Sequence, residues 1–202
     1  MSCETCKKAL AVDQGRVDSI NAVVGSPCVC EAATVSQYSP GPVKNNEKMH
    51  FLASLPNARI DSGHINPQYL SQLEKDGLSV IREAASDDEF AITLRILGEQ
   101  WKDKGKTFEG VVSFYASQVR DIKEPRLCCI YDTGEPDRPH HAELMVTKIA
   151  VCYPDLKENE LKKARKERIM KVMKLIGNGF TSAKEFRHGK FFDHGTDAQP
   201  IA

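Results

Sequence analysis

The chain has 202 residues, of which 41% are hydrophobic, and its 28 basic and 28 acidic residues give a formal net charge of zero. This length allows one sizeable hydrophobic core. Because the net charge is zero, the overall charge does not indicate binding to nucleic acid or to a membrane. Any such inference must rest on local clusters of charge. No apolar run reaches the roughly 18–20 residues that span a bilayer, and the N-terminus lacks the apolar segment of a secretory signal. We therefore expect a cytoplasmic protein with no membrane partner.

Four of the seven cysteines lie near the N-terminus: Cys3, Cys6, Cys28 and Cys30. The odd total and the missing export signal argue against a disulfide framework. Two close pairs, CxxC and CxC, could instead supply the tetrahedral ligands of a structural zinc ion, although a one-residue spacer is the less usual half-site. Bound zinc would then supply folding energy directly. Two alternatives stay open, namely a CxxC pair that is completed by a histidine and an N-terminus with free thiols and no metal.

The segment 36–48 combines Ser, Pro, Gly and Asn, which favour turns, and it predicts a linker. The chain is therefore divided into four parts: a zinc-binding N-terminal extension at 1–35, a linker at 36–48, a single α+β domain at 49–192 and a flexible tail at 193–202.

The first elements of the domain are a helix and a strand. Asn66 and Pro67 suit a helix start, and Gly77 suits its end. The run 78–83 reads as a strand. Because side chains alternate between the faces of a strand, Arg82 should point away from Ser79, which argues against a site built from Ser79, Arg82 and Glu83.

Ser86 and Glu89 form a capping box in front of an apolar stripe at helical spacing, which predicts a helix over 87–103. β-branched and aromatic residues predict strands at 111–119 and 127–133. The run 141–151 fits either a helix or a strand, and its β-branched residues favour a strand.

A further capping pair, Asp155 and Glu158, predicts a helix that ends at Ile176. Helices and strands do not alternate regularly along the chain. The order therefore predicts an α+β fold, with a small, mainly antiparallel sheet packed with about three helices and a Cys-containing N-terminal extension.

The loop that follows the 127–133 strand gathers groups that carry protons or bind metal. Asp132, Asp137, His140 and His141 could ligate a divalent ion, whose bound water would attack a phosphate or acyl centre. Alternatively, Glu143 and one histidine could act as acid and base. Adjacent histidines point in different directions, so only one should serve a given site. The structural alternative is a solvated turn.

The helix that ends at Ile176 carries a local excess of about four positive charges. The residues that we nominate for contact with nucleic acid or an acidic protein surface are Lys162, Lys163, Arg165 and Lys166. Aromatic residues for base stacking are absent from this helix. The structural alternative is an amphipathic helix with a solvated basic face.

Two functions from different classes follow. The first is a binding or regulatory module with a zinc-stabilised N-terminus and a basic contact helix, and it needs fewer coincidences. The second is a metal-assisted hydrolase that acts on a phosphate or acyl substrate through the 132–143 loop, with Asp132, His140, His141 and Glu143 as its site residues.

Overall fold

A six-stranded antiparallel sheet forms the centre of the protein, with strand order β4-β5-β2-β1-β3-β6. The computed structural model describes residues 4–12, 14–24, 29–55, 73–120, 128–146, 150 and 153–186. The strands are β1 (Lys48–Leu55), β2 (Leu78–Arg82), β3 (Thr107–Tyr115), β4 (Cys128–Tyr131), β5 (His141–Val146) and β6 (Phe180–Ser182). The described α-helices are α1 (Glu4–Leu10), α2 (Arg16–Val24), α3 (Asp87–Lys102), α4 (Ala116–Arg120) and α6 (Glu158–Ile176).

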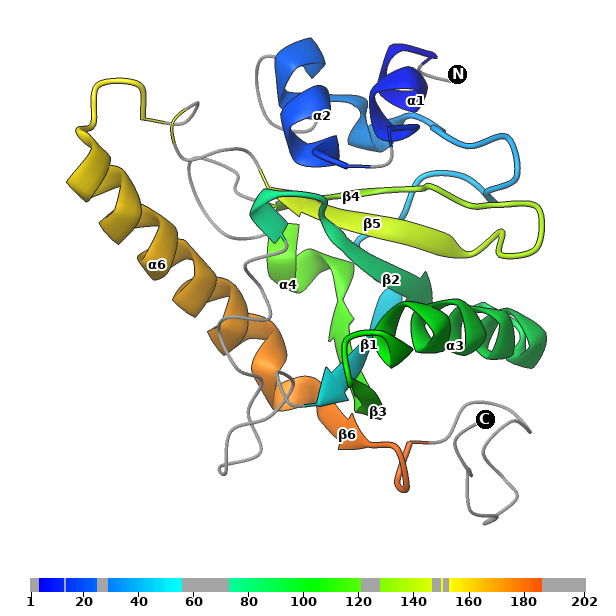
Figure 1. Cartoon of the computed structure of the whole chain (residues 1–202). Coiled ribbons are helices and arrows are strands. Elements are labelled where there is room, and N and C mark those ends of the chain that lie inside the picture. The colour runs from blue at the N-terminus through cyan, green and yellow to red at the C-terminus, as the bar shows by residue number, and fades with distance from the viewer. Residues whose placement is uncertain are drawn as a thin grey trace.

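The helices lie on both faces of this sheet, so the fold has three layers (Figure 1). On one face, α1 and α2 pack over the β4–β5 end and bury Cys6 and Ile20 against Tyr131 and Met145. On the same face, α3 packs further along, where Phe90 joins the strand residues Leu52, Ile81 and Val111. The opposite face holds the largest apolar cluster, which includes residues of α4 and α6.

The predicted α+β class is confirmed, and the sheet is larger than the small sheet that the sequence suggested. The helix predicted over 87–103 is α3. Its N-cap, Ser86, accepts a hydrogen bond from the Glu89 backbone while the Glu89 carboxylate accepts one from the Ser86 backbone, as the capping box predicts. The strands predicted at 78–83 and 127–133 are β2 and β4, and the ambiguous run 141–151 begins with β5.

Two element boundaries differ from the prediction. The strand predicted over 111–119 begins earlier, at Thr107, and α4 follows it from Ala116. The side chain of Gln118 accepts a hydrogen bond from the Tyr115 backbone at 2.7 Å, which helps the chain to turn there. The last helix begins at Glu158 rather than at the predicted cap, Asp155.

Three other segments complete the comparison with the predicted elements. The helix start expected at Asn66 and Pro67 lies outside the described residues. The strands β1 and β6 were not singled out in the sequence. β1 is nevertheless a central strand that pairs with β2 on one side and with β3 on the other.

The residues between the N-terminal helices and β1 lie against the sheet. Val35 and Val43 are buried, and the backbone of Ser36 donates to the carbonyl of Asp132 at 3.2 Å. The 3₁₀ turn Val29–Ala32 lies beside β4, where the carboxylate of Glu31 accepts a hydrogen bond from the Ile130 backbone at 3.0 Å. Among the helices that the structure describes, none combines the length and the apolar character that a membrane span requires.

Candidate functional site

The loop between β4 and β5 is a tight turn that is closed by its own contacts. Glu135 and Arg138 form an isolated bridge, and their side chains make an ion pair at 2.6 Å. Asp137 lies at the exposed tip. The turn therefore separates its acidic residues, and it directs Asp137 into solvent and away from the sheet.

Asp132 connects the loop to the segment that precedes β1. Its Oδ1 accepts a hydrogen bond from the Val35 backbone at 2.8 Å. Its Oδ2 is buried and has no hydrogen-bond partner among the described residues. Burial raises the pKa of Asp132 above its ordinary value, although the bond from Val35 opposes this effect. Asp132 therefore acts as an anchor for the chain next to it.

His140 belongs to a different contact, with helix α3. Its backbone N–H donates to Glu89 at 2.9 Å, and its Nδ1 lies 3.0 Å from the other oxygen of that carboxylate. Burial raises the pKa of Glu89, but hydrogen bonds from the Ser86 and His140 backbones outweigh it and hold this pKa below its ordinary value. Glu89 thus caps α3 and fixes the end of the loop at once.

His141 points in the other direction, as expected for adjacent histidines, and it is 4% exposed. Its Nε2 lies 2.5 Å from Ser79 Oγ, and its Nδ1 lies 3.2 Å from the carbonyl oxygen of Thr133. A carbonyl can only accept, so Nδ1 carries the proton and Nε2 accepts from the Ser79 hydroxyl. Burial, with the charge of Arg138, lowers the pKa of His141 to about 4. The imidazole is therefore neutral at physiological pH.

Glu143 lies two residues further along β5, on the same face of the sheet. It is 1% exposed. Its Oε1 lies 2.8 Å from Arg16 Nη1 and 3.7 Å from His141 Nε2. Burial raises the pKa of Glu143 to about 7, although the Arg16 guanidinium opposes this rise. Glu143 therefore exchanges a proton near neutral pH, as a general acid or base does.

Two polar atoms in this region lack a hydrogen-bond partner among the described residues, Glu143 Oε2 and Arg16 Nε. The backbone of Gly77 lies close to Glu143 Oε2. A β-carbon at Gly77 would lie 3.2 Å from Glu143 Oε2 and 3.0 Å from the Met145 side chain, and its φ of +81° also favours glycine. The site is therefore closely packed on the side of β2.

We call this group the buried polar cluster: Arg16, Ser79, Thr133, His141 and Glu143. The structure thus brings together two of the four predicted catalytic residues and directs the other two, Asp132 and His140, to other partners. Within the described part of the chain, no group of three or more His, Cys, Asp or Glu residues is arranged to hold a metal ion.

Arg16, Ser79 and Thr133 were missed as partners of this site. Ser79 lies opposite Glu143 in the register of β2 and β5. The sequence of neither strand alone predicts which residues pair across them. In the sequence, Ser79 was considered with Arg82 and Glu83, and the alternation of side chains argued against such a site. In the structure Arg82 forms an ion pair with Glu47 at 2.6 Å, so it points away from Ser79, as the alternation of the strand predicts.

The cysteines lie partly outside the described residues, which exclude Cys3, Cys28 and the side chain of Cys30. Cys6 is fully buried among apolar side chains. Cys129 is disulfide-bonded, and its partner lies outside the described side chains. The sequence argued against a disulfide framework and did not single out Cys129 as a bonded cysteine.

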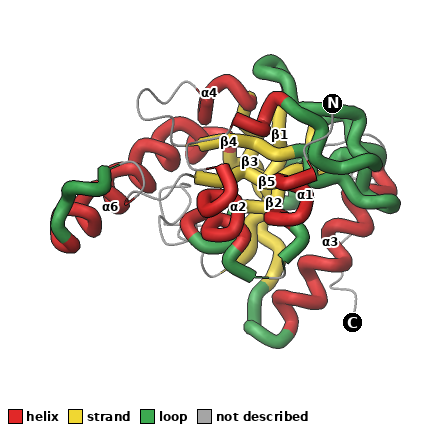
Figure 2. Tube along the Cα trace, turned by 90° about the horizontal axis from the view of Figure 1, so that it is seen from above, coloured by secondary structure: helices red, strands yellow, loops and turns green. Residues whose placement is uncertain are grey.

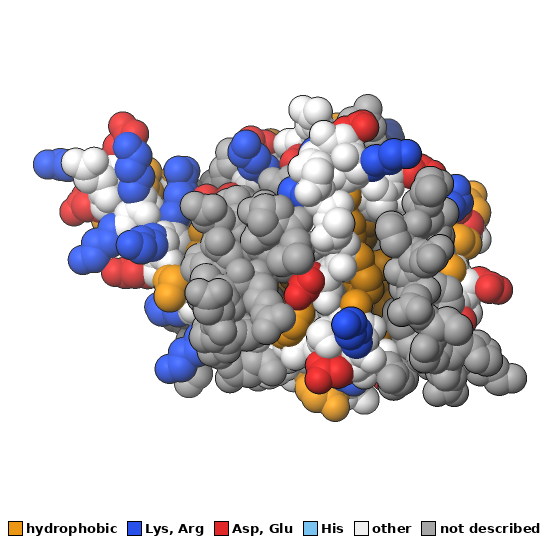
Figure 3. All heavy atoms as spheres, turned by 60° about the horizontal axis from the view of Figure 1, so that its bottom comes forward, with side chains coloured by type: hydrophobic (Ala, Val, Ile, Leu, Met, Phe, Trp, Pro, Cys, Tyr) orange, Lys and Arg blue, Asp and Glu red, His pale blue; other side chains and the backbone are white. Residues whose placement is uncertain are grey.

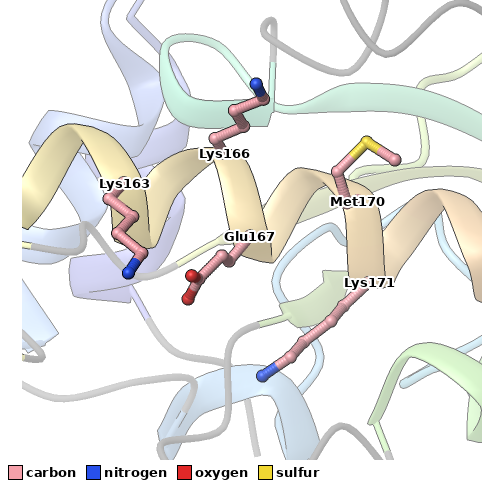
Figure 4. A pocket seen from close by; sticks show the side chains of 5 residues that line it. All are labelled: Lys163, Lys166, Glu167, Met170 and Lys171. Carbon is pink, nitrogen blue, oxygen red and sulfur yellow. The ribbon is translucent and has the colours of Figure 1, made fainter.

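The predicted contact residues on α6 divide into two groups. Lys162 and Arg165 form ion pairs, with Glu158 at 2.9 Å and with Glu74 at 3.2 Å. Lys163 and Lys166 form none with any residue that the structure describes, and they line an open groove of about 470 Å³ together with Glu167, Met170 and Lys171 (Figure 4). Only α6 contributes described residues to this groove.

Comparison with known proteins gives no match: the chain matches no protein-family model, no curated protein and no solved structure.

Proposed function

We propose that the protein is a binding module whose contact surface is the basic face of α6. We define this face by the residues Lys163, Lys166, Met170, Lys171 and Lys174. Their spacing of three, four and seven residues places them on one side of a helix. The opposite side carries Arg168, Val172 and Ile176, which are buried against the body.

The four lysines of this face are exposed. No ion pair joins its four lysines to any described residue, whereas the buried Arg168 pairs with Glu74. The helix extends away from the sheet at its N-terminal half (Figures 1 and 2), and Lys and Arg side chains gather over it in the space-filling view (Figure 3). A row of exposed cations on a projecting helix attracts an acidic partner.

An acidic protein surface is the partner that this face fits best. Met170 is 48% exposed at its centre, and methionine is a flexible apolar side chain that adapts to a partner surface. Protein interfaces combine an apolar centre with a polar rim, as this face does. Contact with a nucleic-acid backbone would use the lysines and leave Met170 without a role, so it is the alternative outcome of the test.

Structural zinc at the N-terminus stays part of the proposal, with Cys3, Cys6, Cys28 and Cys30 as ligands and with stabilisation of the extension as its role. Elemental analysis of the purified protein and of the Cys3→Ser/Cys6→Ser variant tests it. Loss of one zinc with these thiols supports the site. Absence of zinc from the wild-type protein contradicts it.

Two matched triple variants test the contact surface. Lys163, Lys166 and Lys171 are changed to Gln in one, and Lys102, Lys104 and Lys106, at and after the end of α3, in the other. Fluorescence anisotropy measures the affinity of each protein for a labelled acidic amphipathic peptide and for a duplex DNA. We expect the α6 variant to bind the peptide about tenfold more weakly, because three exposed ion pairs contribute roughly 0.5 kcal/mol each.

The control variant loses the same charge and should keep its affinity. Equal losses in both variants would show a general charge effect and contradict a defined face. Tighter binding of DNA than of peptide, with the same dependence on α6, would identify nucleic acid as the partner. A Met170→Ala variant should weaken peptide binding and leave DNA binding unchanged.

The buried polar cluster supports a second candidate function, a hydrolase that acts on a phosphate or acyl substrate through the 132–143 loop. The specific observation is Glu143, whose Oε2 is unpartnered within the described residues and whose pKa lies at about 7. Glu143 would be the acid or base, with Ser79 and His141 beside it. The Glu143→Gln variant should abolish turnover of p-nitrophenyl phosphate. Retained turnover excludes this function.

A further inference from the structure

A second serine–histidine contact lies further along the same face of the sheet. His50 in β1 is the register partner of Ser113 in β3. Glu83 follows the end of β2, and its backbone N–H donates to the Lys48 carbonyl at 2.9 Å. Three segments that are separated by 30 or more residues thus place a hydroxyl, an imidazole and a carboxylate side by side.

These three groups form one continuous hydrogen-bonded chain. Ser113 Oγ lies 2.9 Å from His50 Nδ1, and Glu83 Oε2 lies 2.5 Å from His50 Nε2. An ionised carboxylate only accepts, so Nε2 carries a proton and Nδ1 is left to accept the proton of Ser113. This is the order nucleophile, base and orienting acid that activates a serine, although the nitrogen atoms are exchanged relative to the usual serine triad.

The carboxylate is held in its ionised form. Burial raises the pKa of Glu83, but the charges and hydrogen bonds of His50 and Lys48 outweigh it, and the pKa lies below its ordinary value. Lys48 Nζ lies 3.5 Å from Glu83 Oε2. An ionised Glu83 stabilises the imidazolium that forms when His50 takes up a proton.

The base, His50, is buried, whereas the two side chains that it contacts, Ser113 and Glu83, are partly exposed. His50 is 1% exposed, and its ring contacts Phe90 and Phe186 at centroid distances of 5.8 and 5.4 Å. Ser113 is half-buried, and the Glu83 side chain is 51% exposed. Packing that fixes a base next to an accessible nucleophile is what a preorganised site requires.

We propose that Ser113, His50 and Glu83 form a catalytic triad for acyl transfer from small esters. Ser113 Oγ attacks the ester carbonyl carbon and gives its proton to His50. The bond from that carbon to the alcohol oxygen breaks, and the leaving alcohol takes up the proton from His50, which leaves an acyl group on Ser113. Water then attacks the acyl carbon and gives a proton to His50. The bond from that carbon to Ser113 Oγ breaks, and His50 returns the proton to Ser113 as the acid is released.

An ester is the substrate class that demands least of this site, because an alcohol oxygen leaves more readily than an amine nitrogen and depends less on the proton that His50 supplies. The triad shares no residue with the basic face of α6 or with the buried polar cluster. The proposal of a triad can therefore be tested independently of both proposed functions. Gly179 lies close to the Ser113 backbone, and a β-carbon there would collide with the Ser113 carbonyl oxygen. The 3₁₀ turn Gly177–Gly179 therefore fixes the strand that carries the nucleophile.

A fluorophosphonate probe tests the proposal, since it bonds to an activated serine oxygen and releases fluoride. Intact-mass and peptide-mapping measurements should find one adduct, at Ser113. Ser113→Ala should remove it, and His50→Gln should slow it about 100-fold. Ser117→Ala is the matched control, a half-buried serine on α4 that is outside the triad, and it should be labelled at the wild-type rate.

Circular dichroism establishes that each variant is folded, and a cysteine variant provides a second measurement. Ser113→Cys places a thiol next to His50, and alkylation by iodoacetamide should be at least tenfold faster than in the Ser113→Cys/His50→Gln variant. An unlabelled wild-type protein, an adduct at another residue, or equal thiol reactivity in the two cysteine variants would each overturn the proposal and identify the contacts as structural.

Discussion

Arg16 of α2 and Glu143 of β5 form an ion pair at 2.8 Å that ties the N-terminal helical layer to the sheet. Beside this pair, the Gly15 backbone donates to Asp76 at 2.6 Å, and the Val17 backbone donates to the Lys75 carbonyl at 3.0 Å. The N-terminal helices are thus held to the sheet by polar contacts as well as by the apolar cluster beneath them.

The first prediction concerns this ion pair. Changing Arg16 to Met keeps most of the apolar contact but leaves Glu143 buried without its cation. We expect the free energy of unfolding to fall by about 2 kcal/mol at pH 8, because an unpaired buried charge is costly. Urea denaturation measures it. Arg95→Met is the control, since Arg95 is exposed and, within the described residues, its ion pair is with Glu99 at 3.9 Å, and it should cost within about 0.5 kcal/mol.

A double variant separates the charge from the packing. Arg16→Met/Glu143→Gln removes both charges, so it should recover most of the stability that the single change loses. If the double variant is as unstable as Arg16→Met, the ion pair contributes little and the loss is one of packing.

The second prediction concerns pH. The pKa of Glu143 is raised from 4.5 to about 7, so the folded protein holds a proton that the unfolded chain releases, and this stability is lost as pH rises through 7. The pKa of His141 is lowered from 6.5 to about 4, so its contribution is lost as pH falls. The two effects oppose each other between pH 4.5 and 6.5, and only Glu143 acts above that range.

Urea midpoints at pH 4.5 to 8 distinguish the two groups. The wild-type protein should change little up to pH 6.5 and then lose stability as pH rises through 7. Glu143→Gln should gain stability up to pH 6.5, because only His141 remains, and should then stay constant. A wild-type protein that gains stability between pH 6.5 and 8 would contradict the raised pKa of Glu143.

The third prediction concerns the start of α3. Ser86→Ala removes the side-chain cap and should cost about 1 kcal/mol, whereas Ser86→Asp keeps an acceptor and should cost little. Glu89→Ala should cost more than Ser86→Ala, because Glu89 also accepts from the His140 backbone at 2.9 Å. Thermal denaturation gives the order, and the reverse order would show that the loop is not held by Glu89.

The fourth prediction concerns Cys129. The chain has seven cysteines, and a disulfide at Cys129 consumes two thiols, so Ellman titration of the unreduced, denatured protein should find at most five. Reduction should lower the free energy of unfolding by roughly 2–4 kcal/mol. A count of seven thiols in protein that is purified without reductant would contradict the disulfide. Cys128→Ser serves as the control, because it removes the buried cysteine next to Cys129 and leaves Cys129 in place.

The sequence by itself determined the elements whose causes are local. Helix α3 begins where Ser86 and Glu89 cap it, because both halves of the capping box lie within four residues. The different directions of His140 and His141 and the alternation of Ser79 and Arg82 also follow from the backbone of a single strand and its turn.

The tertiary structure alone decided which of these residues meet. His141 contacts Ser79, which is 62 residues away, and His50 contacts Ser113, which is 63 residues away. Both contacts depend on strand order and register, which are set by the burial of whole strands in a common core rather than by either segment. Asp132, His140 and Glu143 lie within twelve residues of each other in the chain. The packing of the sheet nevertheless gives them three different partners, which are the Val35 backbone, Glu89 and Arg16.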